Sequence, residues 1–309
     1  MWLLFLCAIS VGAAVPIQTA ANTALRERLH SPFLAALINS SVGATIITLA
    51  LILWPHAIAF DLQELSEQPW WMWTGGVIAV VFLVGSIFIM QHLGALGTAL
   101  SVLTGSVCGG MILDSTGLLR VPMQDFTPIK GLGLILALVG FALVLKLPTK
   151  FKQHQQAINP RLIPFALLGI VGGVLQVTQS AVNSELSLHI GSSIAAGLVT
   201  MLQSMLILLV IIACKGEKLR SIFTLPLGKG SWIFCGGLCG ASYLIVNALL
   251  LKVVGAGPLV ILNLAGQLTA ALLIDRLAWF GAKRKEIYLS QIVGLVIVFA
   301  AVALIKNPF

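Results

Sequence analysis

Two pairs of amide side chains occur at the same spacing in otherwise apolar stretches of this chain. Gln18 and Asn22 form the first pair, and Gln179 and Asn183 form the second. Residues four apart lie on one face of an α-helix, so each pair would present two amides together. Amides in an apolar helix either hydrogen-bond to a neighbouring helix or contact a polar solute along its pathway. The residues alone leave both interpretations open.

A second group of neutral polar residues is expected nearer the middle of the apolar stretches. Asn263 and Gln267 share one helix face, and Ser106 is the counterpart of Gln267 in the internal repeat described below. Facing each other, these side chains would form a lining of amides and hydroxyls, which suits a polar uncharged or zwitterionic solute better than a cation. Small-residue spacing, as in Gly105 and Gly109, supports close helix packing as the alternative.

Asp114 and Asp275 are the carboxylates closest to the interior of an apolar stretch. Each is expected near the C-terminal end of its helix, where a negative charge opposes the helix dipole. They are our candidates for proton coupling; the alternatives are an ion pair between Asp275 and Arg276 and a backbone cap formed by Asp114. The five histidines and five cysteines show neither metal-ligand nor disulfide spacing, so we expect no metal and no cofactor.

The composition restricts the class of protein before any motif is considered. Of 309 residues, 9% are charged and 59% are apolar, against roughly 25% and 45–50% in soluble domains. This excludes soluble enzymes, nucleic-acid-binding proteins and disordered chains. The net charge of +8 is instead explained by cationic loops of a membrane protein.

The apolar residues divide into ten stretches, each about long enough for one membrane-spanning helix. The first is not preceded by Lys or Arg, so we interpret it as a span and not as a cleaved signal. The stretches are Trp2–Leu25, Pro32–Trp54, Trp70–Gln91, Leu96–Leu118, Ile129–Lys146, Leu162–Leu186, Ser192–Cys214, Ser231–Lys252, Gly257–Phe280 and Ile287–Ile305. The sequence therefore predicts an all-α membrane protein with ten transmembrane helices.

The cations predict how these helices are oriented. Fourteen of the 18 Lys and Arg residues lie in the loops after the first, third, fifth, seventh and ninth stretches. Cytoplasmic loops carry the excess of cations, so these loops are expected in the cytoplasm. Both termini would then be extracytoplasmic, and the protein would be a multi-pass membrane protein.

The chain contains an internal repeat at an offset of 161 residues. The residues that coincide include glycines and polar side chains: Gly12 with Gly173, Gln18 with Gln179, Asn22 with Asn183, Gly105 with Gly266 and Asp114 with Asp275. We therefore predict two units, residues 1–150 and 151–309, each with five spans. An odd number of spans inverts the second unit, as in many secondary transporters. In that arrangement the two amide pairs would lie near opposite mouths of one cavity.

Two motifs resemble those of a known family. The first is the segment PIQTAANTAL at residues 16–25, followed by Ser31 and Pro32; the second comprises Gly94, Gly105, Asp114, Gly117 and Pro122. They resemble the YdcZ family of inner-membrane exporters in the drug/metabolite transporter superfamily, and the resemblance covers essentially the whole chain. Many members are single five-span units, so this chain looks like a fused tandem form. The resemblance implies a small-solute exporter.

The second half departs from the pattern at Val177, Glu185 and Ala278, where the first half has Pro16, Ala24 and Gly117. These departures indicate that the halves have specialised and that a strictly symmetric site is in doubt.

We therefore expect a secondary transporter, an exporter of a small polar or zwitterionic solute by alternating access. The sequence lacks the metalloprotease, serine-hydrolase and phosphate-binding-loop motifs, so we expect no enzymatic activity. The alternative is a lipid-flipping or membrane-assembly protein. The expected partners are a small-molecule solute and the lipid bilayer, without nucleic acid. One chain holds both repeats, which is compatible with a monomer, but the sequence leaves the oligomeric state, the transport direction and the energy source open.

Overall fold

A computed structural model describes residues 2–53, 67–123, 127–144, 162–223, 231–277 and 288–306. Within these ranges the secondary structure is helical, without strands, which confirms the expected all-α class. The elements are α1 (Trp2–Leu29), α2 (Pro32–Leu53), η2 (Trp70–Trp73), α4 (Gly75–Thr116), η3 (Leu118–Arg120), α5 (Pro128–Val144), α7 (Ile163–Ile190), α8 (Ser193–Lys215), α9 (Arg220–Phe223), η5 (Ser231–Phe234), α10 (Cys235–Val254), α11 (Ala256–Leu277) and α12 (Leu289–Lys306).

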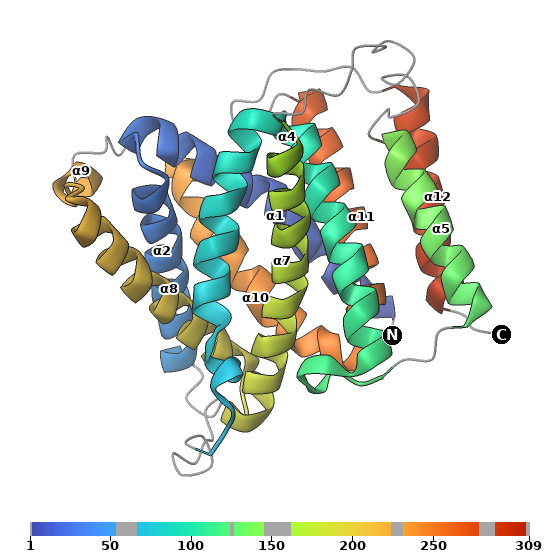
Figure 1. Cartoon of the computed structure of the whole chain (residues 1–309), viewed down its shortest axis with the longest axis horizontal. Coiled ribbons are helices and arrows are strands. Elements are labelled where there is room, and N and C mark those ends of the chain that lie inside the picture. Colours follow the sequence, from blue (N-terminus) through green and yellow to red (C-terminus); the bar gives the residue numbers. More distant parts are fainter. Residues whose placement is uncertain are drawn as a thin grey trace.

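Helix α4 is 42 residues long, but it folds back and supplies two of the predicted spans. Both parts of α4 contact α7 at the same level. A Cβ on Gly172 would lie 3.7 Å from the ring of Phe82, and one on Gly173 would lie 2.0 Å from the carbonyl oxygen of Val102. A straight helix would place Phe82 and Val102 about 30 Å apart. The chain therefore reverses between a first limb (75–89) and a second limb (101–116), as Figure 1 shows.

The two repeats run in opposite directions through the molecule. In Figure 1, α1 rises from the N-terminus whereas its counterpart α7 descends, and α2 descends whereas α8 rises. The same opposition holds between the first limb of α4 and α10, between the second limb and α11, and between α5 and α12. Both termini therefore lie at one end of the molecule. The predicted inverted repeat of five helices is present.

Glycines bring the two repeats into direct backbone contact, and these contacts follow the repeat. A Cβ on Gly105 would lie 1.8 Å from the carbonyl oxygen of Ile170, and a Cβ on Gly266 would lie 1.9 Å from that of Ile9. Each residue of the second contact is the repeat counterpart of one in the first. The first helix of each repeat thus packs against the fourth helix of the other, so the two units are interleaved.

The outer surface of the helices is apolar. Leu206 and Val296, for example, are 64% and 63% exposed, which suits contact with lipid chains. By length and hydropathy, five helical segments can each cross a membrane: Trp2–Leu29, Pro32–Leu53, Ile163–Ile190, Ser193–Lys215 and Ser231–Val254. The two limbs of α4, α5, α11 and α12 supply further apolar helices. Together these features describe an all-α membrane protein.

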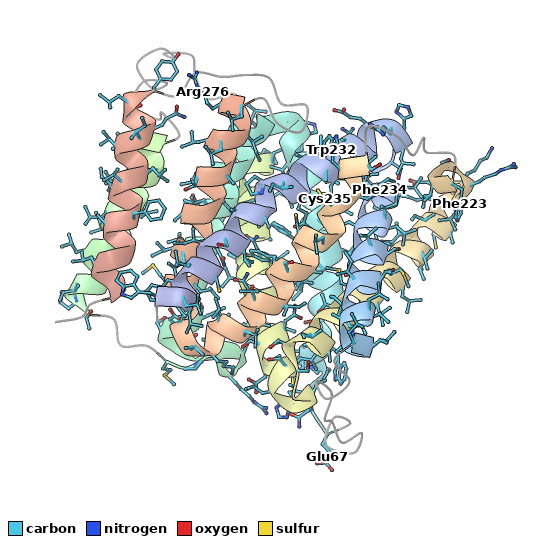
Figure 2. All side chains as sticks on the ribbon, turned by 180° about the vertical axis from the view of Figure 1, so that it is seen from behind. Glu67, Phe223, Trp232, Phe234, Cys235 and Arg276 are labelled. Atoms are coloured by element: carbon cyan, nitrogen blue, oxygen red, sulfur yellow. The ribbon has the colours of Figure 1, made fainter. Side chains whose placement is uncertain are left out.

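The molecule has two distinct ends. Figure 2 places Arg276 at one end, together with Trp232 and Phe234 near the start of α10, and Glu67 at the other. We call the end with Arg276 the basic end, because Arg26 and Arg28 in the last turn of α1 and the turn after α8 also lie there. We call the opposite end, which holds both termini, the terminal end. The predicted assignment of the basic end to the cytoplasm stays a prediction.

Candidate functional site

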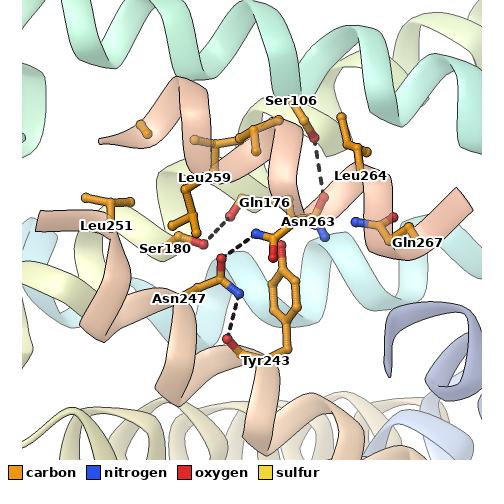
Figure 3. Close-up of a pocket in the computed structure, with 13 residues that line it drawn as sticks. Ser106, Gln176, Ser180, Tyr243, Asn247, Leu251, Leu259, Asn263, Leu264 and Gln267 are labelled. Atoms are coloured by element: carbon orange, nitrogen blue, oxygen red, sulfur yellow. Dashed lines mark hydrogen bonds between the residues drawn. The ribbon is translucent and has the colours of Figure 1, made fainter. Parts of the chain in front are cut away.

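A small polar pocket lies at the interface of the two repeats (Figure 3). It is enclosed by the second limb of α4, α7, α10 and α11. Its polar side chains are those of Ser106, Gln176, Ser180, Tyr243, Asn247, Asn263 and Gln267. Three residues singled out from the sequence, Ser106, Asn263 and Gln267, are thus brought together. Their part in transport stays a prediction.

Hydrogen bonds between neighbouring helices organise the pocket wall. The hydroxyl of Ser106 donates to the side-chain oxygen of Gln176 at 3.3 Å. On the opposite wall, Asn263 Nδ2 donates to Asn247 Oδ1, and Asn247 Nδ2 donates to the backbone carbonyl of Tyr243 at 2.9 Å. These bonds connect α4 with α7 and α11 with α10, so the pocket would change shape when those helices move.

One polar atom of the wall is left without a partner. Asn263 is only 3% exposed, and its Oδ1 has no hydrogen-bond partner among the described residues. A buried acceptor in this state costs about 1–3 kcal/mol. The enclosed space is about what one water molecule requires, so a solute would need the surrounding helices to separate. Asp, Glu, Lys, Arg and His are absent from the residues that line the pocket, so its chemistry is hydrogen bonding without charge.

The pocket is asymmetric although the scaffold repeats. The counterparts of Asn263 and Gln176 in the first repeat are Val102 and Val15. Polar groups in the pocket therefore come mainly from the second repeat, and Ser106 on α4 is the polar contribution of the first. This agrees with the expectation that the halves have specialised.

The two predicted glutamines lie outside the pocket, in contacts between helices. Gln18 Nε2 donates to Asn39 Oδ1 at 3.3 Å and joins α1 to α2. Gln179 Nε2 donates to the carbonyl oxygen of Gly75 at 3.3 Å and joins α7 to the start of α4. In this conformation both amides connect helices, which was the alternative to solute contact.

The two asparagines of these pairs are buried at opposite ends of the molecule. A Cβ on Gly236, at the start of α10, would lie 2.9 Å from Asn22 Oδ1; one on Gly75, at the start of α4, would lie 2.6 Å from Asn183 Oδ1. Asn183 Oδ1 accepts from the hydroxyl of Thr200 at 2.7 Å. Asn183 Nδ2 and both amide atoms of Asn22 lack partners among the described residues. The opposite placement follows the inverted repeat, but neither residue opens into the pocket.

Asp114 caps a different helix from the one that carries it. Its carboxylate accepts from the backbone N–H of Ala256, the first residue of α11, at 2.8 Å. A negative charge at a helix N-terminus is favourable, so this contact offsets the unfavourable place of Asp114 at the end of its own helix. This backbone cap reaches across the repeats. The side chain of Asp275 lies outside the described residues, and proton coupling by either carboxylate stays a prediction.

A buried ion-pair cluster lies at the terminal end of the pocket. Glu185 of α7 is 4% exposed and contacts Lys252 Nζ of α10 at 2.5 Å and Arg120 Nη1 of η3 at 3.2 Å. His189, one turn further along α7, lies 3.6 Å from the same carboxylate. Lys252 also donates to the carbonyl oxygen of Arg120 at 2.7 Å. The cluster ties together three elements that are remote in sequence.

Our sequence reasoning did not select several of these residues. Gln176 has Val15 as its counterpart in the first repeat, so the internal repeat does not mark it, and Ser180 has the hydroxyl residue Thr19. Glu185 was noted only as a departure from the repeat pattern. The available signal was the residue type itself, because a carboxylate near an apolar stretch needs a buried partner.

Comparison with known protein families identifies the repeat. The family model described as "Putative inner membrane exporter, YdcZ" matches residues 3–143 and again residues 164–304. The two matches begin 161 residues apart, which is the offset seen within the sequence.

Two of the proteins that are similar to this chain show what each repeat and the whole fold correspond to. "Inner membrane protein YdcZ" of Escherichia coli (strain K12) is 31% identical over 138 residues, which are 44% of this chain and 90% of that protein. That relative therefore corresponds to one repeat. A solved structure titled "Crystal structure of protein" is 14% identical, with a TM-score of 0.65 over 98% of this chain and 94% of that one. It shows the same fold. With both halves matched, the chain belongs to the YdcZ family of inner-membrane proteins and carries the family unit twice in tandem.

Proposed function

We propose that this protein exports a small polar or zwitterionic solute across a bacterial inner membrane by alternating access. The observation that carries the proposal is the polar pocket without charged side chains in its lining, which lies at the interface of two inverted repeats. Inverted repeats can exchange conformations, so that a central site opens to one side and then to the other. The family description as an exporter supports transport over catalysis.

Different contacts would close the two ends of the pocket. Towards the basic end, the bond between Gln18 and Asn39 lies against Gly240, one turn before Tyr243 of the pocket wall. Towards the terminal end, the Glu185–Lys252 ion pair follows directly after Leu251, which lines the pocket. We propose that each contact breaks when its end opens.

The solute is identified by comparing the metabolites of cells that lack the protein with those of cells that overproduce it. Candidate solutes are then tested for flux in proteoliposomes. We expect one solute class to be retained in cells without the protein and to move in proteoliposomes with it. Movement of labelled phospholipid without movement of any solute would overturn the proposal in favour of lipid flipping.

Alternating access is tested with a cysteine in the pocket. Ser180→Cys, in a background without the native cysteines, should react with a membrane-impermeant maleimide from either side of the membrane. Conditions that raise labelling from one side should lower it from the other. Parallel changes on both sides would indicate a continuous pore and would contradict the mechanism.

The proposed orientation has its own test. Lys218→Cys at the basic end and Glu67→Cys at the terminal end both replace exposed residues. In intact cells we expect labelling at position 67 and protection at position 218. The reverse pattern would place both termini in the cytoplasm.

A further inference from the structure

The orientation of one buried amide in the pocket is determined by its neighbours. The backbone carbonyl of Tyr243 can only accept, so the atom of Asn247 that faces it must be the donor Nδ2. Asn247 therefore presents Oδ1 to Asn263, and Asn263 must use Nδ2 as the donor to it. The amide assignments, which are often ambiguous, are fixed by this sequence of bonds. Asn263 is left with its oxygen free.

The free oxygen of Asn263 requires a donor. It is buried in the pocket and has no partner among the described residues. Buried polar atoms are nearly always hydrogen-bonded, and an exception calls for an explanation such as a ligand. A hydroxyl or an amide N–H of a solute would satisfy this acceptor. A further side chain that can donate, the amide of Gln267, lies in the same pocket.

Among the described residues, the surroundings of the pocket offer no site for a charged group. A solute carboxylate could be bound by the N-terminus of α11, where Ala256 lines the pocket. However, that N–H already donates to the carboxylate of Asp114, which would repel a second anion. A solute cation would need a free carboxylate, and Glu185 is already paired with Lys252 and Arg120. An unpaired charge buried in such a site is strongly unfavourable.

We infer that the solute is an uncharged molecule that donates a hydrogen bond from a hydroxyl or amide group to Asn263 Oδ1. This narrows the polar or zwitterionic class of the proposed function, on which it rests, to neutral solutes such as polyols, sugars or small amides. Asn263 is then a specificity-determining residue.

The test uses a metabolite extract that is separated by charge. A cation exchanger at low pH retains amines and zwitterions, an anion exchanger retains acids, and neutral solutes pass through both. Each fraction is offered to proteoliposomes with the wild-type protein and to empty liposomes, and the solutes captured inside are measured by mass spectrometry. We expect capture from the neutral fraction.

Two variants link that capture to the pocket. Asn263→Leu removes the acceptor and should lower capture of the neutral solute by about tenfold, the effect of one lost hydrogen bond to a buried partner. Ser40→Ala removes a polar group of similar burial outside the pocket. It should leave the chemical class of the captured solute unchanged. Size-exclusion profiles verify that both variants are folded.

The outcomes separate this inference from the proposed function. Capture only from a retained fraction would overturn the neutral-solute inference and leave transport intact. Capture from the neutral fraction that is unchanged in folded Asn263→Leu would also overturn it. Capture from none of the fractions would instead refute the proposed function itself.

Discussion

Removing the cation at position 252 should open the terminal end of the pocket. Lys252 Nζ lies 2.5 Å from Glu185, and the two side chains are 19% and 5% exposed. A hydrogen bond to a charged group contributes about 1.5–3 kcal/mol. If the bond breaks on opening, Lys252→Gln should therefore raise the population open at this end by roughly 10- to 150-fold.

The same cluster contains its own control. Arg120 contacts the same carboxylate at 3.2 Å, but its side chain is 54% exposed. Solvent-exposed ion pairs contribute at most about 1 kcal/mol, so Arg120→Gln should change the population by no more than roughly fivefold. The expected order of effects is thus set by burial and not by the number of charges.

The assay is the labelling rate of Ser180→Cys, which lines the pocket, by an impermeant maleimide from the terminal end. We expect a large increase with Lys252→Gln, a small one with Arg120→Gln and none with Lys252→Arg. A double variant of Glu185→Gln and Lys252→Gln should show less than the sum of the two single effects, because both single variants break the same contact between Glu185 and Lys252. Equal effects of Arg120→Gln and Lys252→Gln, or additive effects in the double variant, would refute the proposed closure.

Three further changes test the packing and the polar contacts. Gly105→Ala should reduce the folded yield strongly, because its Cβ would lie 1.8 Å from a backbone oxygen. Gly85→Ala, whose Cβ would have nothing within 4 Å, should instead gain up to about 1 kcal/mol of helix stability. Thermal unfolding of both variants measures the difference. Asp114→Ala should lower the free energy of unfolding by about 1 kcal/mol through loss of the helix cap, whereas Asp114→Asn should leave it nearly unchanged. If Asp114→Asn loses flux driven by a pH gradient, that loss would support proton coupling by Asp114 instead. Combined Gln18→Leu and Gln179→Leu should abolish flux without unfolding, and full flux would reduce these amides to packing contacts.

The sequence predicts the helices well because the membrane restricts what a chain can do. Each span must be apolar over its full length and must pair its backbone groups internally, so helices can be found by hydropathy alone. The reversal within α4 is an example of spans that hydropathy locates correctly. Two separate apolar stretches were expected there, and the contacts of Phe82 and Val102 with α7 require two limbs. Five spans per repeat then predicted the inversion.

The contacts between helices were less accessible from the sequence. The repeat pairs Gly105 with Gly266, but nothing in that register says that each contacts the first helix of the other repeat. For the same reason, the sequence did not predict which residues form the ion-pair cluster. Glu185, Lys252 and Arg120 lie on three elements, and only the fold brings them together. Asp114 was placed correctly at a helix end, but its partner was one repeat away.

The asymmetry of the pocket follows from having both repeats in one chain. A protein with a single repeat can build an interleaved scaffold only from two identical units, so any side chain in the pocket would occur twice. Here Asn263 lines the pocket while its counterpart is Val102, and Glu185 pairs with Lys252 while its counterpart is Ala24. A tandem chain can therefore keep the symmetric glycine contacts between its two repeats. Under the proposed function, it can at the same time bind the solute mainly with the second repeat and close each end of the pocket with a different contact. Substituting Val102→Asn should consequently add a polar group without creating a second site, because its neighbour at the position of Asn247 is Ser86.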